Sequence, residues 1–396
     1  MQNYSPTSSE AAEQAPLTLF SKSLVNSGET RDTGLILTKD QIKHLKRYEM
    51  AGLALPIELD KVIAYLAYET GAGKGLNATD FQKTFQLVHG HARQWNPLRT
   101  DLLSVSDKLA IFAGSMQVYG ASMEEVFKDT RVLALIEQHG IRTVEDIRRI
   151  ELEHGFKFPG VEDSDRDDLG YYLNQILLKV QEQEAEAQNI KRRLDAFGME
   201  LANCVIPEIK LKLATIDNNS LGSEIQTLQT KIDARAKDID EKNKEYKELV
   251  KQAIGSITSG LIMVIYLSVE AERIRKERNE LSKQQEVDIA LMDTRNRILA
   301  SLNRVRADFQ DLDLIVIDAD IATKNLIVVW NSMSNFIAGS SEQINLINDG
   351  LSLRRFKNQF NLVVKPWETI EKNAFALLDV FAQADAEFRE EYGVKK

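Results

Sequence analysis

No proline occurs between Pro207 and Pro366, so about 160 consecutive residues lack the strongest helix breaker. The whole chain of 396 residues carries only seven prolines. Proline disrupts a helix because it lacks the backbone N–H and its ring clashes with the preceding turn. The long proline-free stretch therefore favours long helices, and the sequence predicts an all-α protein.

The cleanest repeat in the sequence lies between residues 221 and 252. One helical face carries four residues spaced by seven: Ile225, Ile232, Ile239 and Tyr246. The companion position carries three leucines: Leu221, Leu228 and Leu249. Arg235 and Lys242 occupy that companion position in the middle of the repeat. A sustained seven-residue repeat indicates a coiled-coil arm, roughly 48 Å long at 1.5 Å per residue.

An uncharged segment of 17 residues, Ala253–Val269, follows this arm and is flanked by densely charged sequence on both sides. It contains ten large apolar side chains: Ile254, Ile257, Leu261, Ile262, Met263, Val264, Ile265, Tyr266, Leu267 and Val269. Burying each of them is worth roughly 1.5–3 kcal/mol. We therefore expect this segment to contact either protein or lipid, since such a surface is costly to leave in water.

The length of this apolar run leaves three alternatives open. As one helix it would reach about 25 Å, which is marginal against a hydrocarbon core of about 30 Å. Gly255 and Gly260 favour a break or a close helix contact. The run is therefore a buried core helix, a permanent transmembrane anchor or a tip that contacts membranes conditionally. A position at the far end of a hairpin favours the conditional tip.

Apolar residues at helical spacing continue beyond the run and predict a return helix that pairs with the first arm. These residues are Ile274, Leu281, Leu291, Ile298, Leu302, Val305, Phe309 and Leu312. We therefore expect an elongated helical tail bundle, a long antiparallel coiled-coil neck and a small apolar head. The expected segments are a mobile tail 1–34, a first bundle part 35–216, an ascending neck 217–252, the head 253–269, a descending neck 270–312 and a last bundle part 313–396.

Local signals predict further helices within the bundle. Thr38 followed by Gln41 is a capping-box pattern, and Pro56 ends or bends the helix that it starts. Further helices are expected at Asp80–Gln94, Leu98–Ala113, Ser122–Gln138 and Trp367–Tyr392. The single cysteine, Cys204, continues an apolar seam that includes Leu201, so we expect a buried and inert thiol.

Several function classes are disfavoured. A net charge of −10 with interspersed acidic and basic residues argues against nucleic-acid binding. The stretch TGAGKG lacks the first glycine and the Ser or Thr of a phosphate-binding loop. The pair His89 and His91 diverges on a helix, and EDSDRDD lacks the glycine and glutamate of a calcium loop. We therefore expect no catalytic residues, no cofactor and no metal, and a protein that is not an enzyme.

The N-terminal stretch has no basic region followed by an apolar one, so no secretory signal peptide is recognised. If the protein leaves its cell, we expect it to be secreted or released without a classical signal peptide.

Four stretches together resemble a known family. They are LTKDQIKHLKRYEMAGLALP, the coiled coil with its apolar run and EAERIRKER, DLDLIVIDADIATKNLIVVW, and FKNQFNLVVKPWETI. From about Leu35 onward, the chain is similar to the A component of the α-xenorhabdolysin type of binary α-helical pore-forming toxins, distant relatives of the cytolysin A fold.

The resemblance implies a virulence toxin active in cytolysis and hemolysis. A soluble monomer would bind the target-cell membrane through the head, Ile254–Val269, and join a B component in a hetero-oligomeric ring. In this family the B component is thought to supply most of the membrane-crossing wall. A structural coiled-coil protein and a permanently anchored coiled-coil protein are the alternatives.

Overall fold

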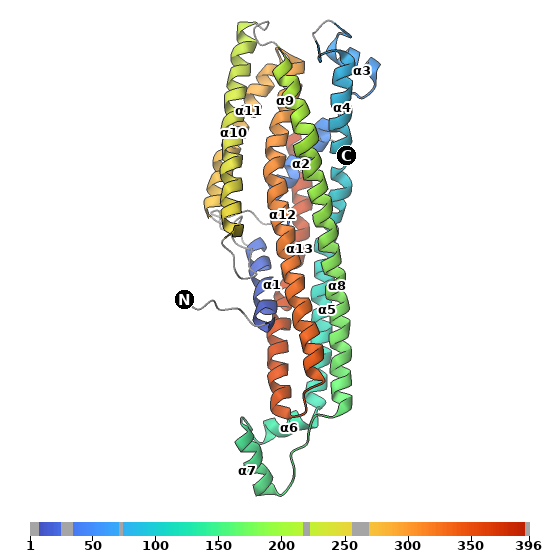
Figure 1. Ribbon diagram of the computed structural model, residues 1–396, viewed down its shortest axis with the longest axis vertical. Helices are drawn as coiled ribbons and strands as arrows, with labels where there is room; N and C mark the ends of the chain where they lie inside the picture. The colour runs from blue at the N-terminus through green and yellow to red at the C-terminus, as the bar shows by residue number, and fades with distance from the viewer. Residues whose placement is uncertain (1–7, 25–34, 71–73, 217–221, 256–268, 393–396) are drawn as a thin grey trace. The chain divides into compact units, whose positions relative to one another are not determined.

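The computed structural model describes residues 8–24, 35–70, 74–216, 222–255 and 269–392. These residues form helices joined by turns, with no strand among them, which confirms the all-α prediction (Figure 1). In chain order the elements are α1 Ser8–Leu24, α2 Lys39–Leu53, α3 Leu59–Leu66, α4 Ala78–Ala92, α5 Trp95–Asp129, α6 Arg131–Gln138, α7 Val144–His154, α8 Asp163–Glu200, the π-helical turn η1 Leu201–Val205, α9 Ile206–Thr215, α10 Ser223–Gly255, α11 Val269–Asp293, α12 Arg297–Ile344 and α13 Gly350–Tyr392.

Helix α2 begins with the predicted capping box. The Thr38 N–H donates to Gln41 Oε1 at 2.9 Å, and the Gln41 N–H donates to Thr38 Oγ1 at 3.4 Å. These two bonds satisfy backbone donors that the first turn of a helix leaves without partners. The helix ends at Leu53, before Pro56.

Helix α5 is continuous where the sequence indicated two helices with a break after Ala113. The glycines of this stretch serve close packing instead of a turn. A Cβ on Gly120 would lie 2.7 Å from Cγ1 of Val364 on α13, closer than real Cβ contacts allow. Gly120 therefore lets α13 approach α5, at the modest helix-propensity cost of glycine.

Helix α13 begins at Gly350 instead of near Trp367 and contains Pro366 in its interior. The buried residues Phe356, Phe360, Val363 and Trp367 follow one another at steps of four, three and four. This spacing places them on one face, whose burial outweighs the local cost of proline. The prediction of a start at Trp367 was wrong, because the buried face of α13 continues on the N-terminal side of Pro366.

The chain divides into two compact units. The first comprises Met1–Lys22, Val105–Gln188 and Asn325–Leu378. Its core contains an aromatic group in which the Phe112 ring lies 4.9 Å from Trp330 and 4.7 Å from Trp367. The two indoles stack on each other at 5.7 Å.

The second unit comprises Ser23–Ser104, Asn189–Lys324 and Asp379–Lys396. Its core includes Tyr48, whose ring lies 5.6 Å from those of His91 and Phe309. This unit also contains α10 and α11, the two helices that bracket the apolar run, together with the α2 and α12 residues that contact them.

Candidate functional site in the α10–α11 hairpin

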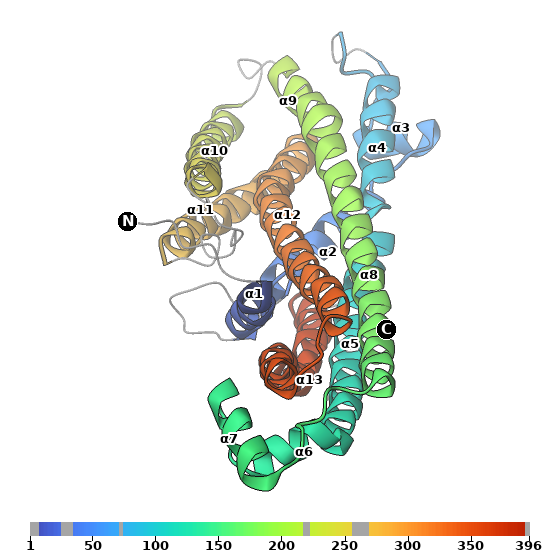
Figure 2. The ribbon, with the colours of Figure 1, turned by 60° about the horizontal axis from the view of Figure 1, so that its bottom comes forward.

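Helices α10 and α11 lie side by side as an antiparallel pair, visible in both Figure 1 and Figure 2. Ion pairs between the helices define the register, because residue numbers rise on α10 as they fall on α11. The pairs are Glu224–Arg295 just beyond the end of α11 (2.8 Å), Arg235–Asp288, Lys242–Glu277 (2.7 Å) and Glu245–Arg273 (3.1 Å).

The heptad face of α10 is largely buried. Ile232, Ile239 and Tyr246 are fully buried, while Ile225, Leu228 and Leu249 are half-buried. Leu221 lies outside the described residues. The buried companion row stands one residue after the leucines of the sequence pattern: Gln229, Ala236, Asn243 and Val250.

Two amides in this companion row are satisfied by α12. Gln229 and Asn303 exchange hydrogen bonds through their side chains, with Asn303 Nδ2 donating to Gln229 Oε1 at 2.8 Å. Asn243 Nδ2 donates to the backbone oxygen of Gln310 at 2.8 Å. A buried amide at a helix interface tolerates one register only, because any slip leaves it without partners. These contacts therefore fix α10 against α12.

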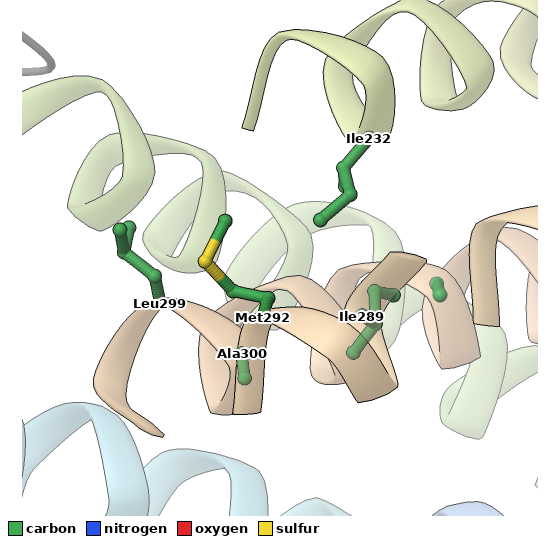
Figure 3. Packing of buried hydrophobic residues seen from close by; sticks show 6 residues of the cluster. Ile232, Ile289, Met292, Leu299 and Ala300 are labelled. Atoms are coloured by element: carbon green, nitrogen blue, oxygen red, sulfur yellow. The ribbon is translucent and has the colours of Figure 1, made fainter. Parts of the chain in front are cut away.

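An apolar cluster joins the three helices at the end of the hairpin farthest along the chain from the apolar run. Figure 3 shows Ile232 of α10 together with Ile289 and Met292 of α11. Leu299, Ala300 and Ala307 of α12 complete this buried group, and the first two are labelled in the figure. It provides the hydrophobic contact that holds this end of the hairpin to α12.

The buried face of α11 is polar along the middle of the helix, between Ala271 and Ile274 at its start and Ile289 and Met292 near its end. Five of its buried residues are polar or charged: Arg275, Arg278, Ser282, Gln285 and Asp288. Leu281, expected on the seam, is half-buried, and Leu291 is 51% exposed. We use the term polar seam for Arg275 and Arg278 of α11, their partners Tyr246, Asp311 and Asp318, and the α2 residues His44 and Arg47 that contact Asp311.

Asp311 of α12 is the first centre of the polar seam. It forms an ion pair with Arg278, and both side chains are only 2% exposed. On the α2 side, His44 Nδ1 lies 2.7 Å from Asp311 Oδ2, and Arg47 Nη2 donates to the same oxygen at 2.7 Å. Burial disfavours the charged carboxylate, but Arg278, His44 and Arg47 outweigh burial and hold the pKa of Asp311 well below its usual range.

Asp318, also on α12, is the second centre. The Tyr246 hydroxyl donates to Asp318 Oδ1, Arg275 Nη2 lies 3.2 Å from that oxygen, and Gln41 Nε2 donates to Oδ2 at 2.7 Å. Burial, with the nearby charge of Asp318, raises the pKa of the Tyr246 phenol well above its normal value. The hydroxyl therefore stays protonated and acts as a donor.

Asp308 lies one turn before Asp311 on α12 and is less well compensated. Its Oδ1 accepts from Arg47 Nε at 2.9 Å, while its buried Oδ2 has no hydrogen-bond partner among the described residues. Burial raises the pKa of Asp308 to about 6, and neighbouring Asp311 adds to the rise. This carboxylate is therefore less stable in its ionised form than an exposed aspartate.

The polar seam binds the hairpin through ion pairs and hydrogen bonds instead of apolar contacts. A polar cavity of about 90 Å³ adjoins Arg275, Arg278 and Asp311, large enough to admit water. A buried ion pair contributes little net stability, because desolvation offsets most of the attraction. When such a seam opens, each charge regains its hydration, so separating it costs less than exposing an apolar interface of equal area.

The apolar run itself falls mostly outside the described residues. Ile257, Leu261, Ile262, Met263, Val264, Ile265, Tyr266 and Leu267 all lie there. Ile254 belongs to the last turn of α10, and Val269 is the first residue of α11 and is 60% exposed. Within the part of the chain that the structure describes, no helix combines the length and apolarity needed to cross a bilayer.

A periodic signal for the buried face of α11 is present in the sequence. Arg275, Arg278, Ser282, Gln285, Ile289 and Met292 are spaced by alternating steps of three and four. This is the heptad spacing of a helix interface, here filled mainly by polar residues. This interface is not recognised when only apolar residues are considered.

The other sequence signals have structural roles. The His91 ring is buried: Nε2 donates to the backbone oxygen of Phe197 at 3.0 Å, so Nδ1 accepts from the Tyr48 hydroxyl at 2.6 Å. Lys212 Nζ donates to the backbone oxygen of Gly75, at the end of the TGAGKG stretch, at 2.9 Å.

The prediction that Cys204 is buried was wrong, since its side chain is exposed. Pro207 has no N–H, and the N–H of Ile206 reaches back five residues to the oxygen of Leu201. The resulting π-helical turn inserts one residue into the helical period. The buried positions after Leu201 are therefore Val205 and Ile209, and Cys204 faces outward.

Comparison with known proteins identifies the fold. No protein-family profile and no curated protein sequence matches the chain. Soluble SmhA of the tripartite alpha-pore forming toxin Smh from Serratia marcescens matches with a TM-score of 0.55 and 12% identity, over 96% of this chain and 98% of SmhA. The chain shares the SmhA fold.

Two further structures match 90% of this chain. XaxA from Xenorhabdus nematophila is 22% identical, with a TM-score of 0.46 over 99% of its own chain. YaxA from Yersinia enterocolitica is 24% identical, with a TM-score of 0.49 over 100% of its own chain. Both are structural matches to the type of toxin component that the sequence resembles, and the fold assignment rests on SmhA.

Proposed function

We propose that this protein is a non-enzymatic component of an α-helical pore-forming cytolysin. It binds target-cell membranes through the segment Ile254–Val269 and assembles with a B-type partner component into an oligomeric pore. The SmhA fold supports this proposal, because SmhA is part of a tripartite alpha-pore forming toxin. The head, neck and tail organisation expected from the sequence belongs to the same proposal.

The observation that carries the proposal is the pairing of an apolar run with a polar seam. The run of ten large apolar residues lies between α10 and α11. Of these two helices, α10 packs mainly through apolar residues, whereas α11 is attached to α12 in part through the buried charges of Arg275 and Arg278. Lipid offers the apolar residues burial, while water offers the seam residues hydration. Both exchanges favour movement of the hairpin when a bilayer is present.

Lysine substitution within the run tests membrane binding. We expect Ile262→Lys and Ile265→Lys to abolish co-flotation with liposomes and to leave the helical circular-dichroism spectrum unchanged, because a lysine at the bilayer centre costs about 2.5–3.5 kcal/mol. Leu178→Lys on α8 is the matched control, since it changes an exposed apolar residue outside the run. Its flotation should equal that of the unmodified protein.

The same assay separates the alternatives. A structural coiled-coil protein never floats with liposomes, and a permanently anchored protein requires detergent during purification. Unchanged flotation of both lysine variants would refute the assignment of the run as the membrane-binding element.

A further inference from the structure

A groove of about 520 Å³ lies between α2, α11 and α12 in the second unit. Its apolar lining consists of Met50, Ala51, Ala54, Ile289 and Ala307. Arg47, Glu286 and Asp308 line one end, and Arg304 stands one turn from Asp308 towards the other end. Glu286 is 42% exposed, and Arg304 forms no ion pair within the described part of the chain.

The geometry of the groove suits a helix. Arg47, Met50, Ala51 and Ala54 share one face of α2, and span about 10 Å at 1.5 Å per residue. Because the alanine side chains are small, side chains of an approaching helix can enter the space between α2, α11 and α12. Amphipathic helices bind grooves of this kind through apolar residues repeated every three or four positions.

Three exposed apolar stripes of the described helices could occupy such a groove in a second copy. They are Ile111 and Val118 on α5, Tyr171 and Leu178 on α8, and Val287 and Leu291 on α11. A lysine stands next to each of the three stripes. The stripes differ in whether this lysine forms an ion pair. Lys108 pairs with Glu186 at 2.9 Å, and Lys179 pairs with Glu182 at 3.5 Å. Lys283, one turn before Val287, makes no ion pair with any described residue.

We propose that the groove of one molecule binds the outer stripe of α11, Lys283 to Leu291, from a second copy of this chain. The charges select a parallel arrangement of the two α11 helices. In that arrangement Lys283 meets the exposed carboxylate of Glu286, which Arg47 also contacts, while Val287 and Leu291 meet the apolar lining. The antiparallel arrangement would place Lys283 against Arg304, where like charges repel.

The groove and the stripe lie on different flanks of α11. Glu286 and Ile289 face the groove, whereas Val287 and Leu291 are exposed. Successive helical residues are turned by about 100°, so one molecule presents both surfaces at once. The contact is therefore heterologous, and a parallel heterologous contact repeats from molecule to molecule. It does not require a membrane and stands independently of the proposed function.

Disulfide trapping without lipid tests this contact. In a Cys204→Ser background, one protein carries Ala51→Cys and a second carries Val287→Cys. We expect oxidation of the mixture to give at least tenfold more cross-linked dimer than oxidation of either protein alone. Equal yields from the separate proteins, or no cross-link in the mixture, would overturn the proposal. Neither result bears on the liposome flotation of the Ile262→Lys variant.

A charge exchange tests the orientation. Adding Lys283→Glu to the Val287→Cys protein should lower the mixed yield about tenfold, and Glu286→Lys on the Ala51→Cys protein should restore it. Lys244→Glu on α10 is the matched control and should leave the yield unchanged. If Lys283→Glu has no effect, the charge-selected parallel docking is wrong.

Discussion

The buried pair Arg278–Asp311 allows a quantitative test of the polar seam. Replacing Asp311 by leucine removes the carboxylate that Arg278 contacts and leaves a guanidinium that is 2% exposed without its acid. Loss of one partner of a buried pair costs roughly 3–5 kcal/mol. Arg47 keeps its contacts with Glu286 and Asp308, so the cost falls mainly on Arg278. We expect Asp311→Leu to weaken the attachment of α11 by this amount.

The double variant Arg278→Met/Asp311→Leu should behave differently. Replacing a whole buried ion pair by apolar side chains is often neutral or stabilises by about 1–4 kcal/mol. The second substitution should therefore recover at least about 2 kcal/mol of the loss caused by Asp311→Leu. It should also slow dye release from liposomes, because an apolar interface costs more to open in water.

Amide hydrogen exchange of α11 peptides, with urea unfolding as a global measure, reports these free energies. The single variants, the double variant and the unmodified protein form one double-mutant cycle. If the cost of Asp311→Leu is the same, within about 0.5 kcal/mol, with and without Arg278→Met, the two residues are not coupled. That result would refute the claim that the Arg278–Asp311 ion pair holds α11 to α12.

Two further substitutions test other parts of the second unit. Asp308 has its pKa raised to about 6, above the value of about 3.9 in an unfolded chain, so the folded state binds its proton more tightly. Protonation of Asp308 therefore contributes fully to the free energy of unfolding below pH 4, and this contribution is lost as the pH rises through 6. The loss is about 1.4 kcal/mol between pH 5.0 and 7.5. Asp308→Asn should abolish this part of the pH dependence of urea unfolding. Gly198→Ala places a Cβ 2.5 Å from Cγ1 of Val316 and should cost about 1–3 kcal/mol in the same assay. Val316→Ala should rescue it. Gly170→Ala is the control that should not destabilise, because its Cβ would meet no described atom within 4 Å beyond its own helical turn.

The sequence reveals one row of the α10 interface but not the other. Ile232, Ile239 and Tyr246 are large and apolar, so their seven-residue spacing is visible without structural knowledge. The second row contains Gln229 and Asn243, whose burial depends on partners that α12 supplies more than 60 residues later. A single sequence does not show those partners. The companion row was therefore predicted at the neighbouring leucines, which are apolar.

The buried face of α11 is even harder to predict from the sequence, because it contains charged residues. Its buried arginines, Arg275 and Arg278, lie in a stretch whose composition is typical of a solvated helix surface. They are buried because Asp318 and Asp311 of α12 compensate their charge. Burial of a charged residue is a property of the pair, so only the arrangement of both helices reveals it.

The order of contacts along the hairpin gives it a direction. The apolar cluster around Ile289 and Met292 lies towards the end of α11, whereas Arg275 and Arg278 lie within its first three turns, next to the apolar run. Attachment is therefore hydrophobic far from the run, whereas close to it the buried charges of Arg275 and Arg278 stand beside only two buried apolar residues of α11, Ala271 and Ile274. Local opening follows the distribution of buried apolar contacts. Separation from α12 should consequently begin beside the run, where hydration compensates the lost contacts, while the cluster of Ile232, Ile289 and Leu299 retains the far end.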